Sequence, residues 1–272
     1  MSLQRTLIDY VNPVTVQRCQ SLLSTILGDN KTISSSTGYH LLFFHPVPTK
    51  KTTLSNDGYY SYLTPSAILS QPAPYMRRMW VQGSIEFKKP LKNCWIRCQE
   101  DLKFIKELKK DYFVSLKRTI TDQDGSIFAT ELRTLMYTNK AVSEDFKTQE
   151  EELEPFSNVS IIKVSDIDAM IYSSISSNPH RIHWDRDYCR KVEGYQDLIV
   201  QGPLIVQLAI AHVESVFNKS VTGIKYKNTS HLYVGNDVEI CVREHKSKGS
   251  ARVLIRDTIE KGRVYFEATA RY

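Results

Sequence analysis

Residues 170–204 read MIYSSISSNPHRIHWDRDYCRKVEGYQDLIVQGPL, and no other window of the 272-residue chain is as dense in chemically active side chains. Just before it, Ser165 with Asp168 three residues later forms a helix N-cap signature, and apolar residues follow at helical spacing. The pattern predicts a short helix over 165–177. Asn178-Pro179 ends it, because a residue that precedes proline is disfavoured in the helical region.

The loop after this helix carries two histidines, His180 and His183. The apolar residues Ile182 and Trp184 are expected to anchor the loop, which would place both imidazoles on its exposed side. Imidazole titrates near neutral pH, so either ring is a candidate for proton transfer.

A second helix is predicted to begin at Gly202-Pro203 and to run to residue 217, because proline is favoured in the first turn and apolar residues recur at about 3.6 spacing. The unpaired N–H groups at such a helix start, with the positive end of the helix dipole, can hold a developing oxyanion. Glycine there allows a substrate to come close. A histidine loop beside this helix start indicates proton transfer next to a carbonyl group.

The segments SSNPHRIHWDRDY (176–188) and VEGYQDLIVQGPL (192–204) resemble the signature of the MaoC-type (R)-specific enoyl-thioester hydratases, in which D-x-N-P-L-H is followed by a glycine-opened helix. The resemblance is strongest to the eukaryotic branch with HRIHYD and HGPL segments, the fungal mitochondrial 3-hydroxyacyl-thioester dehydratases among them. Weaker matches lie at Arg77-Arg78-Met79-Trp80, Glu131-x-Arg133 with Tyr137, and Tyr226-Lys227.

The resemblance implies that His183, Ser176 and Asn178 are the catalytic residues. His183 would take the C2 proton, and Asn178 would orient the loop or a water molecule. Ser176 stands where relatives carry the acid/base aspartate. Because a serine cannot act as a base near neutral pH, it could only form a hydrogen bond with the hydroxyl group or with water. Asp185 or Asp187 is the candidate to orient His183.

The resemblance also implies that Gly202, Gln201 and Arg181 form the oxyanion and substrate-binding set. Gln201 replaces the histidine that precedes Gly-Pro in relatives. No metal site and no cofactor are predicted, because the sequence lacks a Gly-x-Gly-x-x-Gly loop and a His-x-x-x-His helix. The other histidines are expected to be structural or surface groups, and residues 50–57 to form a polar loop.

The rest of the chain has mainly strand patterns, and its length suits two units of about 130 residues. A charged stretch at 103–110 is expected to be a solvated helix or a connecting face, and no long helix is expected near it. A hairpin turn is predicted at 122–125. Strands are predicted over 40–45, 80–87, 93–97, 111–116, 127–132, 222–228, 237–243, 251–258 and 263–270.

These patterns, taken with the resemblance, predict an α+β double hotdog. Residues 1–140 would form a degenerate N-terminal hotdog that supplies the substrate tunnel, and residues 141–160 an acidic linker. Residues 161–272 would form the catalytic C-terminal hotdog around the long helix. A monomer is expected, because both hotdogs lie in one chain.

Composition limits the partners. The net charge of +6 favours acidic partners, but the basic residues are scattered, so nucleic acid is not expected. No apolar run approaches the ~20 residues that cross a bilayer, so no membrane span is expected.

Five cysteines without a regular spacing indicate reduced thiols. The first 28 residues are poor in acids and fit a mitochondrial transit peptide, although 22–27 could instead belong to a helix of the mature fold.

The predicted function is that of a hydro-lyase, a (3R)-3-hydroxyacyl-thioester dehydratase of mitochondrial type II fatty acid synthesis. Its substrate would be an acyl carrier protein or coenzyme A thioester. Two alternatives remain. One is a hotdog thioesterase, which needs either a nucleophile, a role compatible with Ser176, or a water activated by a carboxylate near Gly202. The other is a catalytically degenerate protein that binds acyl chains or a partner. Formation of an enoyl product, release of a free thiol, and binding without turnover distinguish the three.

Overall fold

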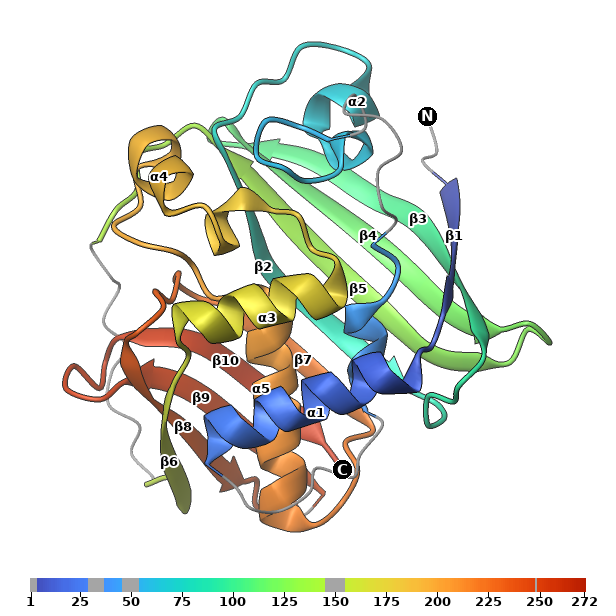
Figure 1. Cartoon of the computed structure of the whole chain (residues 1–272), viewed down its shortest axis with the longest axis vertical. Coiled ribbons are helices and arrows are strands. Elements are labelled where there is room, and N and C mark those ends of the chain that lie inside the picture. The colour runs from blue at the N-terminus through green and yellow to red at the C-terminus, as the bar shows by residue number, and fades with distance from the viewer. Residues whose placement is uncertain (1–3, 29–36, 46–53, 145–154, 248) are drawn as a thin grey trace.

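The computed structural model describes residues 4–28, 37–45, 54–144, 155–247 and 249–272. The strands in these ranges form one antiparallel sheet of ten, in the order β1-β3-β4-β5-β2-β7-β10-β9-β8-β6 (Figure 1). We call β1 to β5 the N-terminal half and β6 to β10 the C-terminal half. The strands are β1 (Gln4–Tyr10), β2 (Arg77–Phe87), β3 (Trp95–Leu108), β4 (Asp111–Asp122), β5 (Ile127–Thr138), β6 (Asn158–Lys163), β7 (Gly223–Asn228), β8 (Asp237–Glu244), β9 (Ser250–Asp257) and β10 (Val264–Arg271).

The helices gather mainly over the C-terminal half. They are α1 (Pro13–Leu27), α2 (Pro65–Leu69), α3 (Asp166–Ser176), α4 (Arg186–Tyr188) and α5 (Gly202–Phe217). Helix α5 is apolar and buried around most of its circumference because β7 to β10 wrap one side and α1 packs against it on the other. None of the helices in the described ranges is long and apolar enough to cross a membrane.

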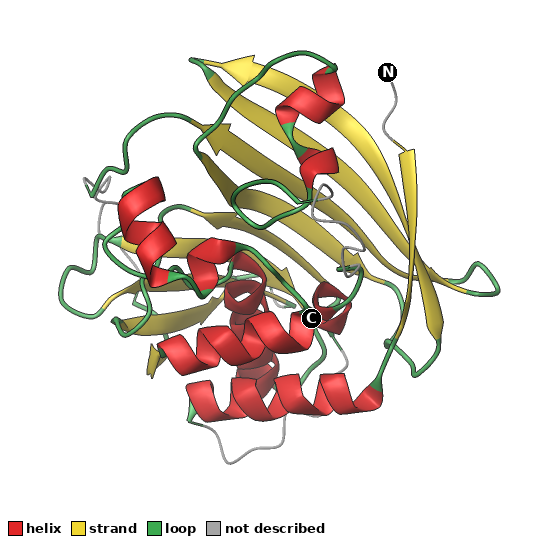
Figure 2. Ribbon diagram, turned by 45° about the horizontal axis from the view of Figure 1, so that its top comes forward, coloured by secondary structure: helices red, strands yellow, loops and turns green. Residues whose placement is uncertain are grey.

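The N-terminal half has no comparable helix on its sheet. Within the described residues, its inner face is covered by the five-residue α2, by a 3-10 helix (Ser61–Leu63) and by loops, and Figure 2 shows how sparse this cover is. Leu63 and Ile68 pack there against Val114 and Tyr137. A second unit without a central helix leaves space beside its sheet.

The two halves meet where β2 pairs with β7, over Gln82–Glu86 and Gly223–Lys227. This pairing ends at Gln82 and Lys227, and β2 also has a bulge between Trp80 and Gln82 in its pairing with β5. Trp80, Gln82 and Lys227 border the cavity described below.

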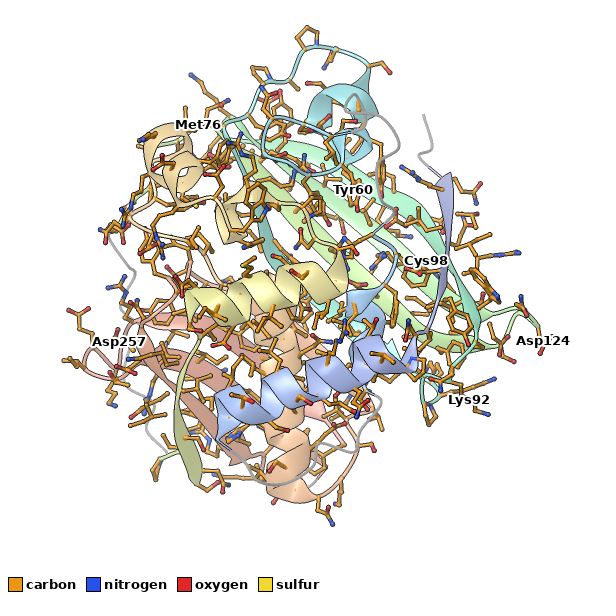
Figure 3. The ribbon with its side chains drawn as sticks, viewed as in Figure 1. Tyr60, Met76, Lys92, Cys98, Asp124 and Asp257 are labelled. Carbon is orange, nitrogen blue, oxygen red and sulfur yellow. The ribbon has the colours of Figure 1, made fainter. Side chains whose placement is uncertain are left out.

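Several predicted elements agree with the structure. Ser165 and Asp168 form a capping box at the start of α3, and Ser177 ends that helix with a left-handed backbone. The hairpin turn joins β4 to β5, with Asp124 at its tip (Figure 3). Helix α5 runs from Gly202 to Phe217, as predicted.

Other predictions are wrong. The run predicted as a strand over 40–45 begins instead with a 3-10 helix (Tyr39–Leu42), whose side chains are all buried. A continuous apolar run can reflect complete burial as well as a strand. The charged stretch at 103–110 is largely the end of β3, whose charged side chains face solvent while its backbone pairs with β4.

The beginning of the chain belongs to the fold. Strand β1 pairs with β3 at the edge of the N-terminal half, and α1 packs against α3 and α5. Cys19 and Leu23 of α1 are fully buried. The second interpretation of residues 22–27, as part of a folded helix, is therefore confirmed.

The acidic linker falls partly outside the described residues, since 145–154 are not among them. Strand β6 begins at Asn158, inside the range expected for the linker. We therefore propose that the C-terminal unit starts at β6, and that α1, although early in the chain, is part of its core.

Candidate active site

A cavity of about 840 Å³ lies between the two halves of the molecule. Its walls come from the signature loop, from the start of α5 and from the inner face of the N-terminal half. The residues that matter for chemistry are Asn178, His180, His183, Gly202, His45, Tyr59, Arg78, Trp80 and Arg133.

His183 is held in one orientation by the backbone. Its Nδ1 lies 2.7 Å from the carbonyl oxygen of Ile199, so the ring donates from Nδ1 and keeps Nε2 as an unprotonated acceptor. Burial lowers the pKa of His183 to about 4, which makes the neutral form dominant at neutral pH. The expected carboxylate does not orient this ring: Asp185 accepts instead from Arg181 and from the backbone N–H of Tyr188.

The loop reverses the predicted exposure. Both histidines are buried, at 7% exposure for His180 and 6% for His183, whereas the expected anchor Trp184 is 49% exposed. Its indole N–H donates to the carbonyl of Pro179 and stabilises the loop on its solvent side. The side chain of Asn178, which lines the cavity, accepts from the N–H of His180 and stabilises the loop on its buried side. The imidazoles therefore line the cavity and do not face bulk solvent.

His180 and His183 touch each other. Their ring centroids are 5.2 Å apart with an interplanar angle of 85°, an edge-to-face contact. Burial, followed by the nearby His183 and Arg78, holds the pKa of His180 well below its usual range. Both rings are neutral in the resting site.

The start of α5 forms the opposite wall. Gly202 is its first residue, and its N–H, at the first position of the helix, has no partner within the helix, whereas Pro203 has no N–H. A side chain at this position would begin 3.3 Å from Nδ2 of Asn228 and 3.6 Å from Cβ of Trp80. Asn228 in turn donates to the carbonyl oxygen of Trp80 and ties β7 to β2 beside the helix start. The site can thus present the N–H of Gly202 to an oxyanion.

Two residues that the sequence placed in the site lie behind it. Ser176 is buried, and its hydroxyl donates to the carbonyl of Tyr172 one turn earlier in α3. Gln201 is buried too, and its amide donates to the carbonyl of Ala169 and the hydroxyl of Ser173. Neither side chain lines the cavity, so we assign them to the support of α3 and not to the chemistry.

Arg181 points outward. Its guanidinium donates to Asp185 at 2.7 Å and lies over the ring of Tyr188 at 4.1 Å. The side chain does not line the cavity. Of the six predicted site residues, the structure brings together His183, Asn178 and Gly202.

The predicted site residues do not include the contribution of residues 37–45 and 54–60. His45 and Tyr59 line the cavity, and burial lowers the pKa of His45 to about 3. Asp57 lies just behind, with its carboxylate 3.3 Å from Nε of Arg78. A run of tyrosines and a polar turn give no signal of this kind by themselves, because more than a hundred residues separate them from the signature loop.

A buried charge network supports the N-terminal wall. Glu131 accepts from Arg133 at 2.7 Å and from Arg118 at 3.0 Å, and Arg118 also donates to Glu100. The two arginines hold the pKa of Glu131 well below its usual range despite its burial. Arg133 also lies over the ring of Trp80 at 4.0 Å, which explains why Glu131-x-Arg133 and Trp80 appear together among the family-like motifs.

Comparison with known proteins finds relatives of one kind over most of the chain. The family model for hydroxyacyl-thioester dehydratase type 2 matches residues 38–234. The mitochondrial hydroxyacyl-thioester dehydratase type 2 of Saccharomyces cerevisiae is 32% identical over 240 residues, which cover 85% of each chain. Its namesake in Schizosaccharomyces pombe is 27% identical over 278 residues, which cover 90% of this chain and 91% of the relative.

Solved structures show the same fold. HtdX of Mycobacterium tuberculosis matches with a TM-score of 0.69 at 13% identity, over 100% of this chain and 99% of its own. A MaoC-like dehydratase from Phytophthora capsici matches with a TM-score of 0.68 at 13% identity, over 100% and 95%. A further M. tuberculosis protein, described as a double hotdog, matches at 0.60 and 12%, over 99% and 94%. The α+β double hotdog predicted from the sequence is confirmed.

Proposed function

Since the chain belongs to the hydroxyacyl-thioester dehydratase type 2 family, we propose that it is a hydro-lyase that interconverts (3R)-3-hydroxyacyl thioesters with trans-2-enoyl thioesters and water. One observation carries the proposal at the level of residues. His183 is a neutral imidazole whose tautomer is fixed by Ile199, and it shares a cavity with the N-terminus of α5.

In the dehydration direction, Nε2 of His183 takes the proton from C2. The electron pair of the C–H bond moves toward the thioester carbonyl, and the backbone N–H of Gly202 stabilises the resulting enolate oxygen. The pair then returns to form the C2–C3 double bond as the C3–O bond breaks, and the hydroxyl leaves as water with the proton that came from C2, so that His183 ends neutral. Asn178 keeps the loop closed so that the imidazole stays in place.

The carrier and the pathway are part of the proposal. We infer an acyl carrier protein or coenzyme A thioester as substrate, and a place in mitochondrial type II fatty acid synthesis, because both yeast relatives are named as mitochondrial enzymes. The N-terminal half would supply the substrate tunnel, since Tyr59, Trp80 and Arg133 of that half line the cavity. The two halves already pair within one sheet, which supports a monomer.

The thioesterase alternative has less support in its nucleophilic form. The hydroxyl of Ser176 donates to a helix carbonyl outside the cavity, and the form with a carboxylate-activated water is tested by the release of a free thiol. The alternative of a catalytically degenerate binding protein depended on the serine at position 176, where relatives carry an aspartate. A measurement of turnover distinguishes it from the enzyme.

The deciding experiment mixes the purified protein with trans-2-enoyl-CoA and follows the absorbance of the enoyl thioester, with His183→Ala as the comparison. We expect the wild-type protein to consume the enoyl signal and give the (3R) alcohol, and the variant to lose this activity. Release of a free thiol would favour the thioesterase. Binding without turnover, also with an acyl carrier protein thioester, would leave only the binding protein.

A further inference from the structure

A turn of the N-terminal half is docked against the signature loop. The backbone N–H of Arg181 donates to the carbonyl of Asp57 at 2.9 Å. Gly58 follows with a φ of +79°, and a Cβ there would lie 2.5 Å from the carbonyl oxygen of Pro179. Only glycine fits so close to the loop in that backbone conformation. The turn therefore brings the Asp57 side chain directly behind the histidines.

The carboxylate of Asp57 is 2% exposed and is the acceptor on which several donors converge. Its Oδ1 accepts the N–H of Tyr59. Its Oδ2 lies 3.3 Å from Nε of Arg78 and 3.9 Å from Nε2 of His180, and the hydroxyl of Tyr75 lies 3.4 Å away. Among the described residues, neither Nε of Arg78 nor Nε2 of His180 has a hydrogen-bond partner.

This geometry assigns a tautomer to His180. Nε2 is the ring nitrogen that faces the carboxylate, at 3.9 Å, so the negative charge of Asp57 favours the tautomer with its proton on Nε2, and Nδ1 is then the acceptor left for the cavity that His180 lines. His183 has the opposite arrangement, with its proton on Nδ1 and its acceptor at Nε2. Two neutral imidazoles in edge-to-face contact thus each offer one unprotonated nitrogen to the substrate.

We propose that His180, supported by Asp57, is a second catalytic residue that carries the proton between His183 and the oxygen on C3. The assignment rests on the proposed dehydratase function. It gives the site a second proton carrier although position 176 holds a serine, and it makes Asp57 a positioning residue supplied by the other half of the molecule.

The proton balance of this relay is complete without any further reactant. In hydration, the water oxygen bonds to C3 while one water proton passes to Nδ1 of His180, and the electron pair of the double bond moves to the thioester oxygen. The proton passes from Nδ1 to Nε2 of His183, which delivers it to C2 as the electron pair returns. Dehydration reverses each step, and both rings end neutral.

The surroundings of His180 fit a ring that is neutral at rest and positively charged only in passing. The groups that face it are Asp57 and Tyr59 of the docked turn, Arg78 of β2 and His183 of its own loop. Burial and the neighbouring cation keep the pKa of His180 well below its usual range. The carboxylate of Asp57 would stabilise the transient charge, as in other carboxylate–histidine pairs.

The test measures two steps of the reaction separately, the removal of the C2 proton and the loss of the hydroxyl group. Exchange of the C2 proton of 3-hydroxybutyryl-CoA with deuterium oxide requires only His183, whereas dehydration requires both histidines. We would measure exchange by mass spectrometry and turnover by enoyl absorbance in wild type, His183→Ala, His180→Gln, Asp57→Asn and Asp197→Asn. Asp197 is the matched control, since its carboxylate is ion-paired to Arg186 and does not line the cavity.

We expect His180→Gln to lose about 100-fold or more in kcat while exchange stays within a few fold of wild type. Asp57→Asn should lose about tenfold in kcat with little change in KM, and Asp197→Asn should match wild type. His183→Ala should lose both reactions. Thermal unfolding of each variant identifies any loss that is due only to misfolding.

Normal turnover in His180→Gln, or a parallel loss of exchange and turnover in that variant, would overturn the relay while leaving the dehydratase function intact. If Asp57→Asn and Asp197→Asn turned over substrate equally fast, the proposal that Asp57 positions His180 would be wrong. A wild-type protein that converts no thioester would overturn both the function and the relay.

Discussion

The ring of His183 and the carbonyl of Ile199 form a 2.7 Å hydrogen bond that leaves a single unprotonated nitrogen for the substrate. The pKa of this ring is lowered to about 4 by burial, so we expect kcat/KM for hydration to show no limb from His183 between about pH 6 and 8 and to fall as the pH approaches 4. Protonation at Nε2 removes the acceptor. A pH profile with the (3R) product quantified checks this, and an acidic limb near pH 6.5 would contradict it.

The same ring makes stability depend on pH. Its pKa is about 4 when folded and about 6.5 when unfolded, so between these values the unfolded chain binds a proton that the folded chain does not. The free energy of unfolding should therefore rise with pH across this window and level off above it. The contribution of this one group is on the order of 3 kcal/mol. Urea unfolding at several pH values measures it, and His183→Ala should flatten the slope.

Gly58→Ala should loosen the signature loop, because the added Cβ lies 2.5 Å from the carbonyl oxygen of Pro179. Gly125→Ala is a matched control: its φ of +81° is close to the +79° of Gly58, but no atom lies within 4 Å of its added Cβ. We expect both variants to lose about 1 kcal/mol from backbone strain, and only Gly58→Ala to lose more stability and most of its activity. Thermal unfolding and the enoyl assay compare them. Equal activity in the two variants would argue against the docking of the turn.

Gly202→Ala should affect the chemistry more than the fold. Alanine suits the first turn of a helix, but the new methyl group meets Asn228 at 3.3 Å and narrows the approach to the N–H of residue 202. We expect a tenfold or greater loss in kcat/KM, on the scale of an impaired oxyanion contact, with an unfolding free energy within about 1 kcal/mol of wild type. Steady-state kinetics would measure the loss in kcat/KM, and urea unfolding would measure the free energy of unfolding of the same variant. Unchanged kinetics would place the thioester oxygen elsewhere.

Glu131→Gln tests the buried charge network. The substitution leaves Arg118 and Arg133 without the carboxylate between them, and breaking a buried pair in this way costs about 3–5 kcal/mol. Asp197→Gln is the exposed comparison, since its partner Arg186 is 41% exposed and such pairs contribute about 1 kcal/mol or less. Urea unfolding of the two variants should separate them clearly. A similar small loss in the free energy of unfolding of both variants would contradict the stabilising role of the buried charge network.

Local sequence signals account for the parts of the fold that are set locally. The capping box at Ser165, the turn at 122–125 and the proline-opened helix α5 each depend on residues within a few positions of one another. The strands were found where polar and apolar residues alternate. The two edge strands, β1 and β6, lie outside the predicted strands, because each has a single buried residue and so gives only a weak alternation of buried and exposed positions.

The site was only partly predictable for the same reason. His183, Asn178 and Gly202 lie within one signature, whereas Asp57 and Tyr59 reach the histidines through tertiary packing. The exposure of the loop was predicted in the wrong sense, because a cavity lets polar rings be buried while the indole of Trp184 closes the turn from outside. Ser176 and Gln201 occupy family positions but turn toward α3.

The docked turn at residues 56–58 has a consequence for how such an enzyme can change over time. Asp57 and Gly58 belong to the half of the molecule that carries no signature loop, yet they contact that loop directly. A replacement in this short turn therefore changes the surroundings of the histidines without any change in the histidine loop itself.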